Sequence, residues 1–121
     1  MSAVRKSETC EEQLRRMCKR IADDITEKAI TRYNGYETEH GEDDEGTLAT
    51  RFMDHVYDIE WITYQDKTYK AARLLVAGGG PNIWVNLQTG TVDGYWGCDK
   101  VLEPFSDNLG LDEYCEEMYG C

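Results

Sequence analysis

The chain has 121 residues, of which 40% are apolar, and its formal net charge at neutral pH is -11. This length fits one domain spanning residues 1–121, and an apolar content that includes three Trp and eight Tyr excludes a compositionally disordered chain. No apolar run approaches the ~20 residues of a membrane span, and no secretory signal begins the chain, so we expect a cytoplasmic protein.

The first predicted element is a long helix that follows eight residues expected to be flexible. Thr9 and Glu12 have the spacing of a capping box, which marks a helix start. Apolar residues then recur at helical spacing: Leu14, Cys18, Ile21, Ile25 and Ala29, widened by Met17 and Ala22. Because Asn34 and Gly35 favour a left-handed helix end, the pattern predicts a helix from Cys10 to Tyr33.

This helix carries a cluster of cations, namely Arg15, Arg16, Lys19 and Arg20. A cluster of this kind can form a phosphate-binding patch. However, acidic residues lie four positions before or after each cation: Glu11, Glu12, Asp23 and Asp24. Since that spacing pairs side chains on a helix face, we expect a solvated, self-paired surface and no direct binding to nucleic acid.

An acidic segment follows at residues 36–46, where no apolar periodicity is present. Its carboxylates are Glu37, Glu39, Glu42, Asp43, Asp44 and Glu45. We interpret the segment as an exposed loop. Calcium binding is the alternative, but calcium ligands normally alternate with spacer residues and these do not. A short helix from about Gly46 to Met53 is expected to lead into a sheet.

The stretch from Val56 to Trp96 predicts four antiparallel strands in a meander. Tyr57, Ile59 and Trp61 alternate with Asp58 and Glu60, as in a strand with one wet face. Further strands are expected at Tyr69–Ala77, around Ile83–Leu87 and at Val92–Trp96. The turns between them are polar or glycine-rich: 65–68, 78–81 and Thr89-Gly90. Gly94, inside the last strand, suggests a bulge.

After Pro104, Ser106 or Asp107 can cap a short C-terminal helix with a narrow apolar stripe of Leu111, Tyr114, Cys115 and Met118. The other face of this helix is acidic, with Asp112, Glu113, Glu116 and Glu117. The predicted fold is therefore α+β: a long N-terminal helix packed on a four-stranded antiparallel meander sheet, with a short C-terminal helix.

Signatures of catalysis or cofactor binding are missing from the sequence. Residues 78–80 are three glycines, but a strand rather than a helix with a Lys follows them, so they indicate a turn and not a phosphate cradle. The cysteines are Cys10, Cys18, Cys98, Cys115 and Cys121, an odd number without metal-ligand spacing. With His40 and His55 they leave a Cys–His pair conceivable. We expect reduced thiols, no metal, no cofactor and no enzymatic activity.

Three aromatic residues are candidate anchors for a protein partner. Trp84 alternates with Ile83 and Val85, so it faces away from them, and one of the adjacent residues Tyr95 and Trp96 must do the same. Exposed Trp and Tyr are typical of protein interfaces. The alternative is that the C-terminal helix covers these residues and makes them part of the core.

Size and acidity give the chain a resemblance, as a class, to the small acidic anti-defence proteins of phages and plasmids: anti-restriction and anti-CRISPR inhibitors, many of which mimic DNA. The resemblance rests on Glu37 to Glu45, Asp58 with Glu60, and Asp112 to Glu117, not on an aligned motif. It implies an inhibitor whose carboxylates replace phosphates in the basic channel of a target protein. The alternatives are an immunity protein or antitoxin against a basic toxin, and a small enzyme or ligand-binding domain that uses the sheet near Trp84 and Tyr95.

Overall fold

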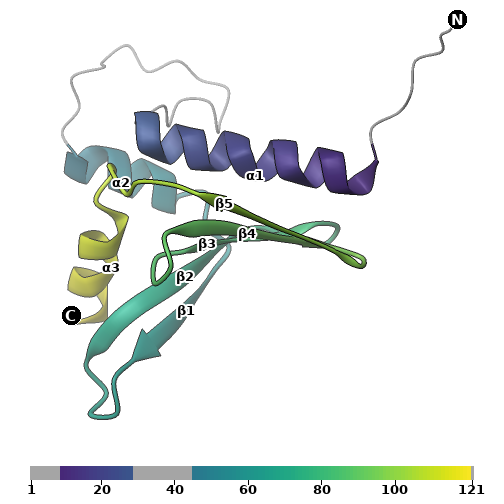
Figure 1. Ribbon diagram of the computed structural model, residues 1–121. Coiled ribbons are helices and arrows are strands. Elements are labelled where there is room, and N and C mark those ends of the chain that lie inside the picture. The colour runs from purple at the N-terminus through teal and green to yellow at the C-terminus, as the bar shows by residue number, and fades with distance from the viewer. Residues whose placement is uncertain (1–8, 29–44, 121) are drawn as a thin grey trace, which may run out of the picture.

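The structure, a computed structural model, describes residues 9–28 and 45–120. These residues form three helices and five strands (Figure 1). In chain order they are α1 (Cys10–Glu27), α2 (Glu45–Met53), β1 (Asp58–Thr63), β2 (Tyr69–Ala77), β3 (Asn82–Asn86), β4 (Thr91–Trp96), β5 (Asp99–Pro104) and α3 (Leu111–Tyr119). Within the described ranges, no helix combines the length and apolar character needed to cross a membrane.

Helix α1 begins where the sequence predicts and ends earlier. The backbone N–H of Glu12 donates to Thr9 Oγ1 at 3.0 Å and that of Thr9 donates to Glu12 Oε1 at 3.0 Å, which confirms the capping box. The helix ends at Glu27 because Lys28 adopts the left-handed conformation, with φ of 61°. The predicted end at Tyr33 is therefore wrong, and Asn34 and Gly35 lie outside the described residues.

The sheet has five strands and not the four that the sequence predicts, in the order β1-β2-β3-β4-β5 with all neighbours antiparallel. The fifth strand, β5, pairs with β4 after a tight turn at Gly97, which has φ of 63°. It contains only two large apolar residues, Val101 and Leu102, which are adjacent and point to opposite faces. That short run does not show the alternation by which a strand is recognised.

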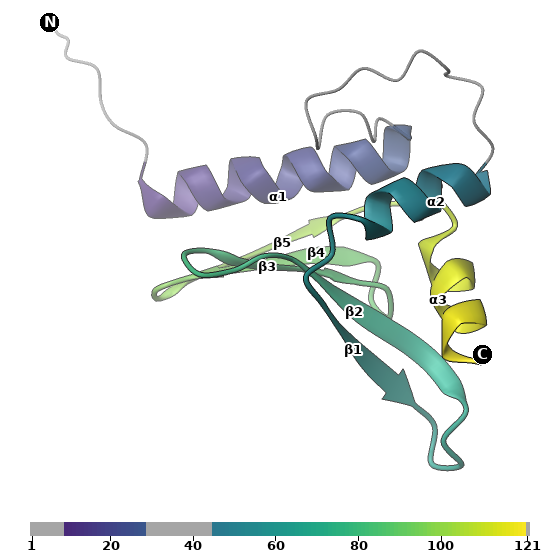
Figure 2. The ribbon, with the colours of Figure 1, turned by 180° about the vertical axis from the view of Figure 1, so that it is seen from behind.

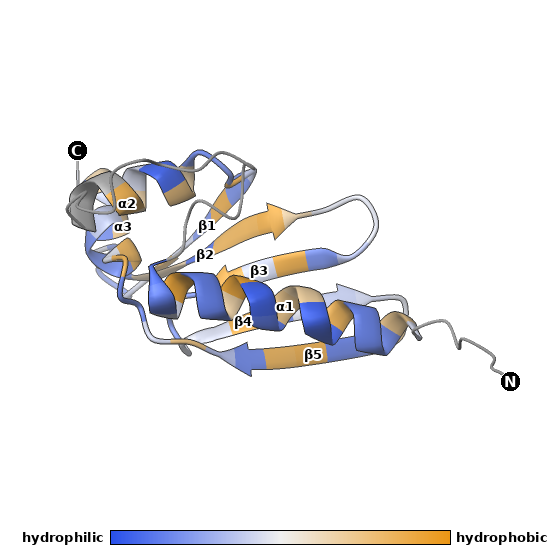
Figure 3. Cartoon of the chain, turned by 90° about the horizontal axis from the view of Figure 1, so that it is seen from above, coloured by the Kyte–Doolittle hydropathy of each residue, from blue (hydrophilic) through white to orange (hydrophobic). Residues whose placement is uncertain are grey.

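All three helices lie on one face of the sheet, and the opposite face is free of described helices. Helix α1 crosses over β4 and β5, α3 packs against β2, and α2 packs against α3 (Figures 1 and 3). The core lies between the helices and the sheet, and it includes Leu14, Cys18, Ala22, Ile25, Phe52, Leu74, Ile83, Val85, Val92 and Leu111. Ile21, which the pattern also assigns to this stripe, is only half-buried at the edge of the core.

Gly94 marks a close approach of α1 to the sheet. The predicted bulge at this residue is wrong, because the register between β3 and β4 is regular and Gly94 pairs with Ile83. A Cβ atom at Gly94 would lie 2.5 Å from Cys18 Sγ and 2.9 Å from Leu14 Cδ1. The glycine therefore provides the space into which the helix packs.

A real irregularity occurs instead in the β1–β2 hairpin. Ile62 pairs with Ala71 but Thr63 pairs with Tyr69, so Lys70 is an extra residue in β2. Because side chains alternate between the faces of a strand, the extra residue turns Tyr69 to the same face as Ala72 and Leu74. The bulge thus brings the ring of Tyr69 to the side of the sheet on which α3 packs. Figure 2 shows α3 beside β2.

The N-terminus of helix α3 is capped by the side chain of Asp107, which precedes the helix in the sequence. Gly110 is the N-cap residue and has no side chain, but both carboxylate oxygens of Asp107 accept hydrogen bonds, from Leu111 N at 2.8 Å and Asp112 N at 2.9 Å. Asp107, one of the two predicted capping residues, therefore fixes where α3 starts and how it is oriented.

Candidate functional site

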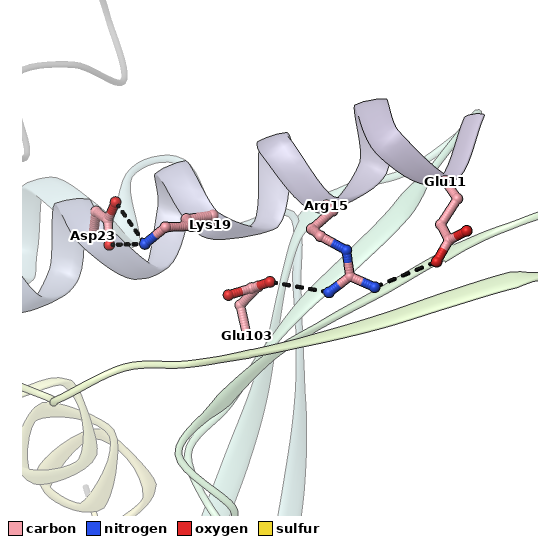
Figure 4. A network of polar contacts seen from close by, with 5 residues as sticks. All are labelled: Glu11, Arg15, Lys19, Asp23 and Glu103. Carbon is pink, nitrogen blue, oxygen red and sulfur yellow. Dashed lines mark hydrogen bonds and ion pairs between the residues drawn. The ribbon is translucent and has the colours of Figure 1, made fainter. Parts of the chain in front are cut away.

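Two of the four clustered cations of α1, Arg15 and Lys19, form ion pairs within the molecule at the spacing that the sequence predicts. Arg15 donates to Glu11 Oε2 on the same helix and to Glu103 Oε2 on β5, both at 3.3 Å, and Lys19 contacts Asp23 at 3.2 Å (Figure 4). Residues 9–28 contain five basic and five acidic residues, so their net charge is zero. Helix α1 therefore lacks the excess of positive charge that a phosphate-binding surface needs.

Helix α3 and the segment before it carry negative charge that is not balanced locally. Residues 107–120 contain five acidic residues, Asp107, Asp112, Glu113, Glu116 and Glu117, and no Lys or Arg. Glu113, Glu116 and Glu117 are exposed. The carboxylates of Glu113 and Glu116 make no hydrogen bond or ion pair with another residue of the described ranges. This acidic surface can bind cations of a partner at little cost in internal contacts.

The two acidic residues of β1 belong to a different surface. Glu60 pairs across the sheet with Arg73, and the two side chains form an ion pair at 2.7 Å. Asp58 Oδ1 accepts a hydrogen bond from the Ile59 amide at 2.9 Å. Both carboxylates lie on the face opposite the helices and are used locally, so the structure does not unite them with the acidic residues of α3.

The three predicted aromatic anchors separate onto the two faces of the sheet. Trp84 and Tyr95 lie on the open face and are half-buried, whereas Trp96 lies on the helix side and packs against the core. The C-terminal helix does not cover Trp84 or Tyr95, because α3 packs on the other face. A cationic side chain of this protein already lies over each of these two rings. Arg73 lies 4.5 Å from the ring centre of Trp84, and Lys100 lies 5.8 Å from that of Tyr95.

The open face also contains a buried carboxylate, that of Asp93. Thr91 Oγ1 donates to Asp93 Oδ1 at 2.6 Å and Asn86 Nδ2 donates to Asp93 Oδ2 at 3.2 Å. These contacts, one from β4 itself and one from the neighbouring β3, satisfy both oxygens, as buried polar groups require. The residue is accounted for by the structure of the sheet.

The acidic loop predicted at 36–46 is mostly outside the described residues. This applies to Glu37, Glu39, Glu42, Asp43 and Asp44, as it does to the predicted flexible residues 1–8. Glu45 and Gly46, assigned to the loop, are instead the first residues of α2. The predicted short helix is confirmed and begins one residue earlier than expected.

An aromatic cluster that the sequence does not reveal joins the hairpin to α3. The ring of Trp61 on β1 lies 6.2 Å from that of Tyr69 on β2 and 5.2 Å from that of Tyr119 on α3. Hydrogen bonds fix the two tyrosines: Tyr69 donates to Asp112 Oδ1 and Tyr119 donates to the backbone oxygen of Lys67, both at 2.8 Å. Burial, together with the Asp112 contact, raises the pKa of Tyr69, which keeps its hydroxyl protonated as a donor.

The alternation in β1 indicates the face on which Trp61 lies, but two features of the cluster cannot be read from the sequence. One is the bulge at Lys70 that turns Tyr69 to this face, and the other is the tertiary contact with Tyr119. The combination of a half-exposed Trp with the acidic helix next to it is therefore visible only in the fold.

The thiols show no arrangement for nucleophilic or metal chemistry in the described ranges. Burial raises the pKa of Cys18 to about 11 and that of Cys115 to about 12, which keeps both thiols neutral and unreactive. Cys10 and Cys98 are exposed and free, while Cys121 and His40 lie outside the described residues. No group of three or more His, Cys, Asp or Glu within residues 9–28 and 45–120 is arranged to hold a metal ion.

Comparison with known proteins gives no match for this chain among family models, curated proteins or solved structures.

Proposed function

We propose that the protein is a non-enzymatic inhibitor that binds a basic, nucleic-acid-binding protein through an acidic surface whose carboxylates replace phosphates. The observation that carries this proposal is the excess of negative charge at residues 107–120, which has five acidic and no basic residues. Charge of one sign on a surface attracts a partner of the opposite sign and raises the rate of encounter. In α1, by contrast, ion pairs cancel the charge.

The proposed target is a defence nuclease or effector of a host cell, such as a CRISPR-Cas protein or a restriction enzyme. Such proteins hold nucleic acid in channels rich in Lys and Arg, where an acidic protein can compete with DNA or RNA. An immunity protein or antitoxin would use the same surface against a basic toxin such as a nuclease. The two alternatives differ only in the target, so binding assays against both kinds of protein distinguish them.

A ligand-binding or enzymatic role for the open sheet face has less support. Arg73 and Lys100 already lie over the two aromatic rings there, and both oxygens of Asp93 accept hydrogen bonds, from Thr91 and Asn86. A ligand that stacked on Trp84 or Tyr95 would have to displace these internal contacts. We therefore place the functional surface on the helix side, at α3.

The test is a competition measurement at one stated salt concentration. Purified candidates (a Cas effector, a restriction endonuclease and a basic nuclease toxin) are each titrated with the protein in the presence and absence of their nucleic acid. The expected result is that at least one candidate binds the protein, and that nucleic acid and protein exclude each other. A candidate that holds both at once, with neither weakening the other, contradicts the phosphate-mimic mechanism.

Salt dependence locates the surface involved. The expected association rate falls as salt rises, because the Debye length shortens from about 10 Å at 0.1 M to about 3 Å at 1 M. Replacing Glu113 and Glu116 together with Gln should reduce this salt dependence. The matched control is replacement of Asp58 and Glu60 with Asn and Gln on the opposite face. An equal effect of both sets of substitutions would contradict the assignment to α3.

A further inference from the structure

We propose that the protein holds an arginine or lysine side chain of its partner at the surface where the β1–β2 hairpin meets α3, between the ring of Trp61 and the carboxylate of Glu116. This hairpin–α3 surface comprises Trp61, Tyr69, Tyr119, Asp112 and Glu116. The proposal rests on the proposed function, which requires a basic partner, and it names the place and the chemistry of one contact.

Trp61 is partly exposed, and its ring is held in a position where it can bind a cation. The residue is 37% exposed, and its ring contacts those of Tyr69 and Tyr119 at ring-centre distances of 6.2 and 5.2 Å. A ring fixed by such packing loses little conformational freedom on binding. A cation within ~6 Å of a Trp face is attracted by the ring quadrupole, and Trp is the strongest aromatic partner for it.

Trp61 differs from three other aromatic residues, each of which already has a Lys or Arg of this chain over its ring. Arg73 lies over Trp84, Lys100 over Tyr95 and Lys70 over Tyr64, at 4.5, 5.8 and 5.4 Å from the respective ring centres. Among the described residues, no Lys or Arg lies over Trp61. Its ring therefore remains available for a cation supplied by another molecule.

A carboxylate lies beside the ring cluster on the neighbouring helix. Asp112, Glu116 and Tyr119 follow each other at spacings of four and three on α3, so they share one helix face. Asp112 is engaged by the Tyr69 hydroxyl at 2.8 Å. The side chain of Glu116 is exposed and makes no hydrogen bond or ion pair within the described residues. Its charge helps to raise the pKa of Tyr69, after burial, Asp112 and Cys115.

Charge favours a basic protein over a second copy of this chain at the hairpin–α3 surface. The adjoining segment 107–120 has five acidic and no basic residues, so two such surfaces repel each other. Arginine fits better than lysine, because its planar guanidinium can stack on a ring and still donate two hydrogen bonds to a carboxylate. Self-association would show itself as a change at Trp61 that depends on protein concentration alone.

The experiment uses the full chain and a minimal probe, the blocked peptide acetyl-Gly-Arg-Gly-amide, with its citrulline counterpart as the uncharged control. Nuclear magnetic resonance follows the indole N–H of Trp61 and the backbone amides of α3. The expected result is a saturable shift at Trp61 and Glu116 with the arginine peptide only. Shifts spread evenly over all acidic segments, no shift at all, or a shift with protein concentration alone would each overturn the proposal.

Two variants with the same charge change provide the matched comparison. Glu116→Gln is expected to weaken the peptide about three- to tenfold, and Glu113→Gln less than twofold, because Glu113 lies outside the Asp112–Glu116–Tyr119 face and shares only the long-range field. Trp61→Leu keeps an apolar side chain and should weaken the peptide similarly to Glu116→Gln. Equal effects of Glu116→Gln and Glu113→Gln would overturn the inference even if Trp61→Leu fails to fold.

The same variants separate this inference from the proposed function. If a basic target protein binds and Glu116→Gln weakens it no more than Glu113→Gln, the inhibitor proposal stands and the Trp61–Glu116 contact is wrong. If the peptide binds at Trp61 while no nucleic-acid-binding protein competes with its nucleic acid, the contact stands and the inhibitor proposal is wrong.

Discussion

Gly94 determines how closely α1 approaches the sheet, and the sequence gives only part of the reason for it. A glycine within a strand suggests either a bulge or a close approach, and the regular pairing with Ile83 leaves the close approach. We expect Gly94→Ala to lower the free energy of unfolding by about 1–3 kcal/mol, because the new methyl group would collide with Cys18 and Leu14.

Gly80 is the control for this prediction. A Cβ at Gly80 meets nothing within 4 Å, and its φ is not in the left-handed region. Gly80→Ala should therefore be neutral or slightly stabilising. Urea denaturation of both variants provides the measurement, and equal effects of the two substitutions would contradict the packing at Gly94.

The buried thiols of Cys18 and Cys115 predict that the stability of the protein depends on pH. In the folded protein the pKa of Cys18 is raised from 9.0 to about 11 and that of Cys115 to about 12 by burial. A raised pKa means that the folded state binds more protons than the unfolded state above about pH 9. The resulting stabilisation is complete below pH 9 and is lost as the pH rises toward 11–12.

The urea midpoint at pH 8 and at pH 10.5 measures this loss. The wild type should lose more stability between the two pH values than a variant with Cys18→Ala and Cys115→Ala, since Tyr69 titrates in both proteins and cancels in the comparison. Identical changes in the two proteins would show that the thiols are not the titrating groups.

At the scale of elements, β5 provides a test of the open sheet face. Val101 is 1% exposed and faces α1, while its neighbour Leu102 is 51% exposed on the opposite face. Val101→Ala should lower the free energy of unfolding by roughly 2 kcal/mol, from two lost methyl groups and the cavity left behind. Leu102→Ala should change it by less than about 0.5 kcal/mol. Similar losses for both variants would mean that another part of the chain covers the second face.

The elements that the sequence predicts well are those whose signals are local. The capping box at Thr9, the strand Tyr69–Ala77 and the hairpin turn at Gly90 each depend on a few neighbouring residues, and each is found where expected. Strand β5 is missed because it has only two apolar residues and is defined by its pairing with β4. The end of α1 is missed because Lys28, and not a glycine or asparagine, adopts the left-handed conformation.

The hairpin–α3 surface could not be predicted for a different reason. Trp61, Tyr69 and Tyr119 are separated in sequence, and a one-residue slip in β2 decides which face Tyr69 occupies. Strict alternation along β2 would place Tyr69 on the face of Ala71, because the pattern of residues in the sequence does not reveal that Lys70 is an extra residue. The chemistry of the proposed contact therefore arises from a register shift and a helix orientation that only the folded chain reveals.

At the scale of the whole molecule, the charge is divided into a balanced part and an unbalanced part. Residues 9–28 have no net charge, and Arg15 and Lys19 among them form internal ion pairs, whereas residues 107–120 contain only acidic charges. Several placements on α3 are unfavourable for folding: Asp112 and Glu116, and Glu113 and Glu117, are like charges four residues apart, and Glu116 also lies toward the negative end of the helix dipole. A carboxylate in such a position is more readily explained by binding than by stability.

Opposite effects on folding and binding are therefore expected from Glu116→Gln. The free energy of unfolding at low ionic strength should rise by roughly 0.3–1 kcal/mol, because a repulsive pair and an unfavourable dipole interaction are both removed. Glu113, in the first turn of α3, interacts favourably with the dipole but is also a like charge four residues before Glu117. These two effects of Glu113→Gln oppose each other, so its stability should rise less than that of Glu116→Gln. Urea denaturation at low and high salt measures both variants, and the difference between them should shrink as salt screens the charges. A Glu116→Gln protein less stable than the wild type would show that this carboxylate supports the fold, and the retention of Glu116 would then need no binding partner to explain it.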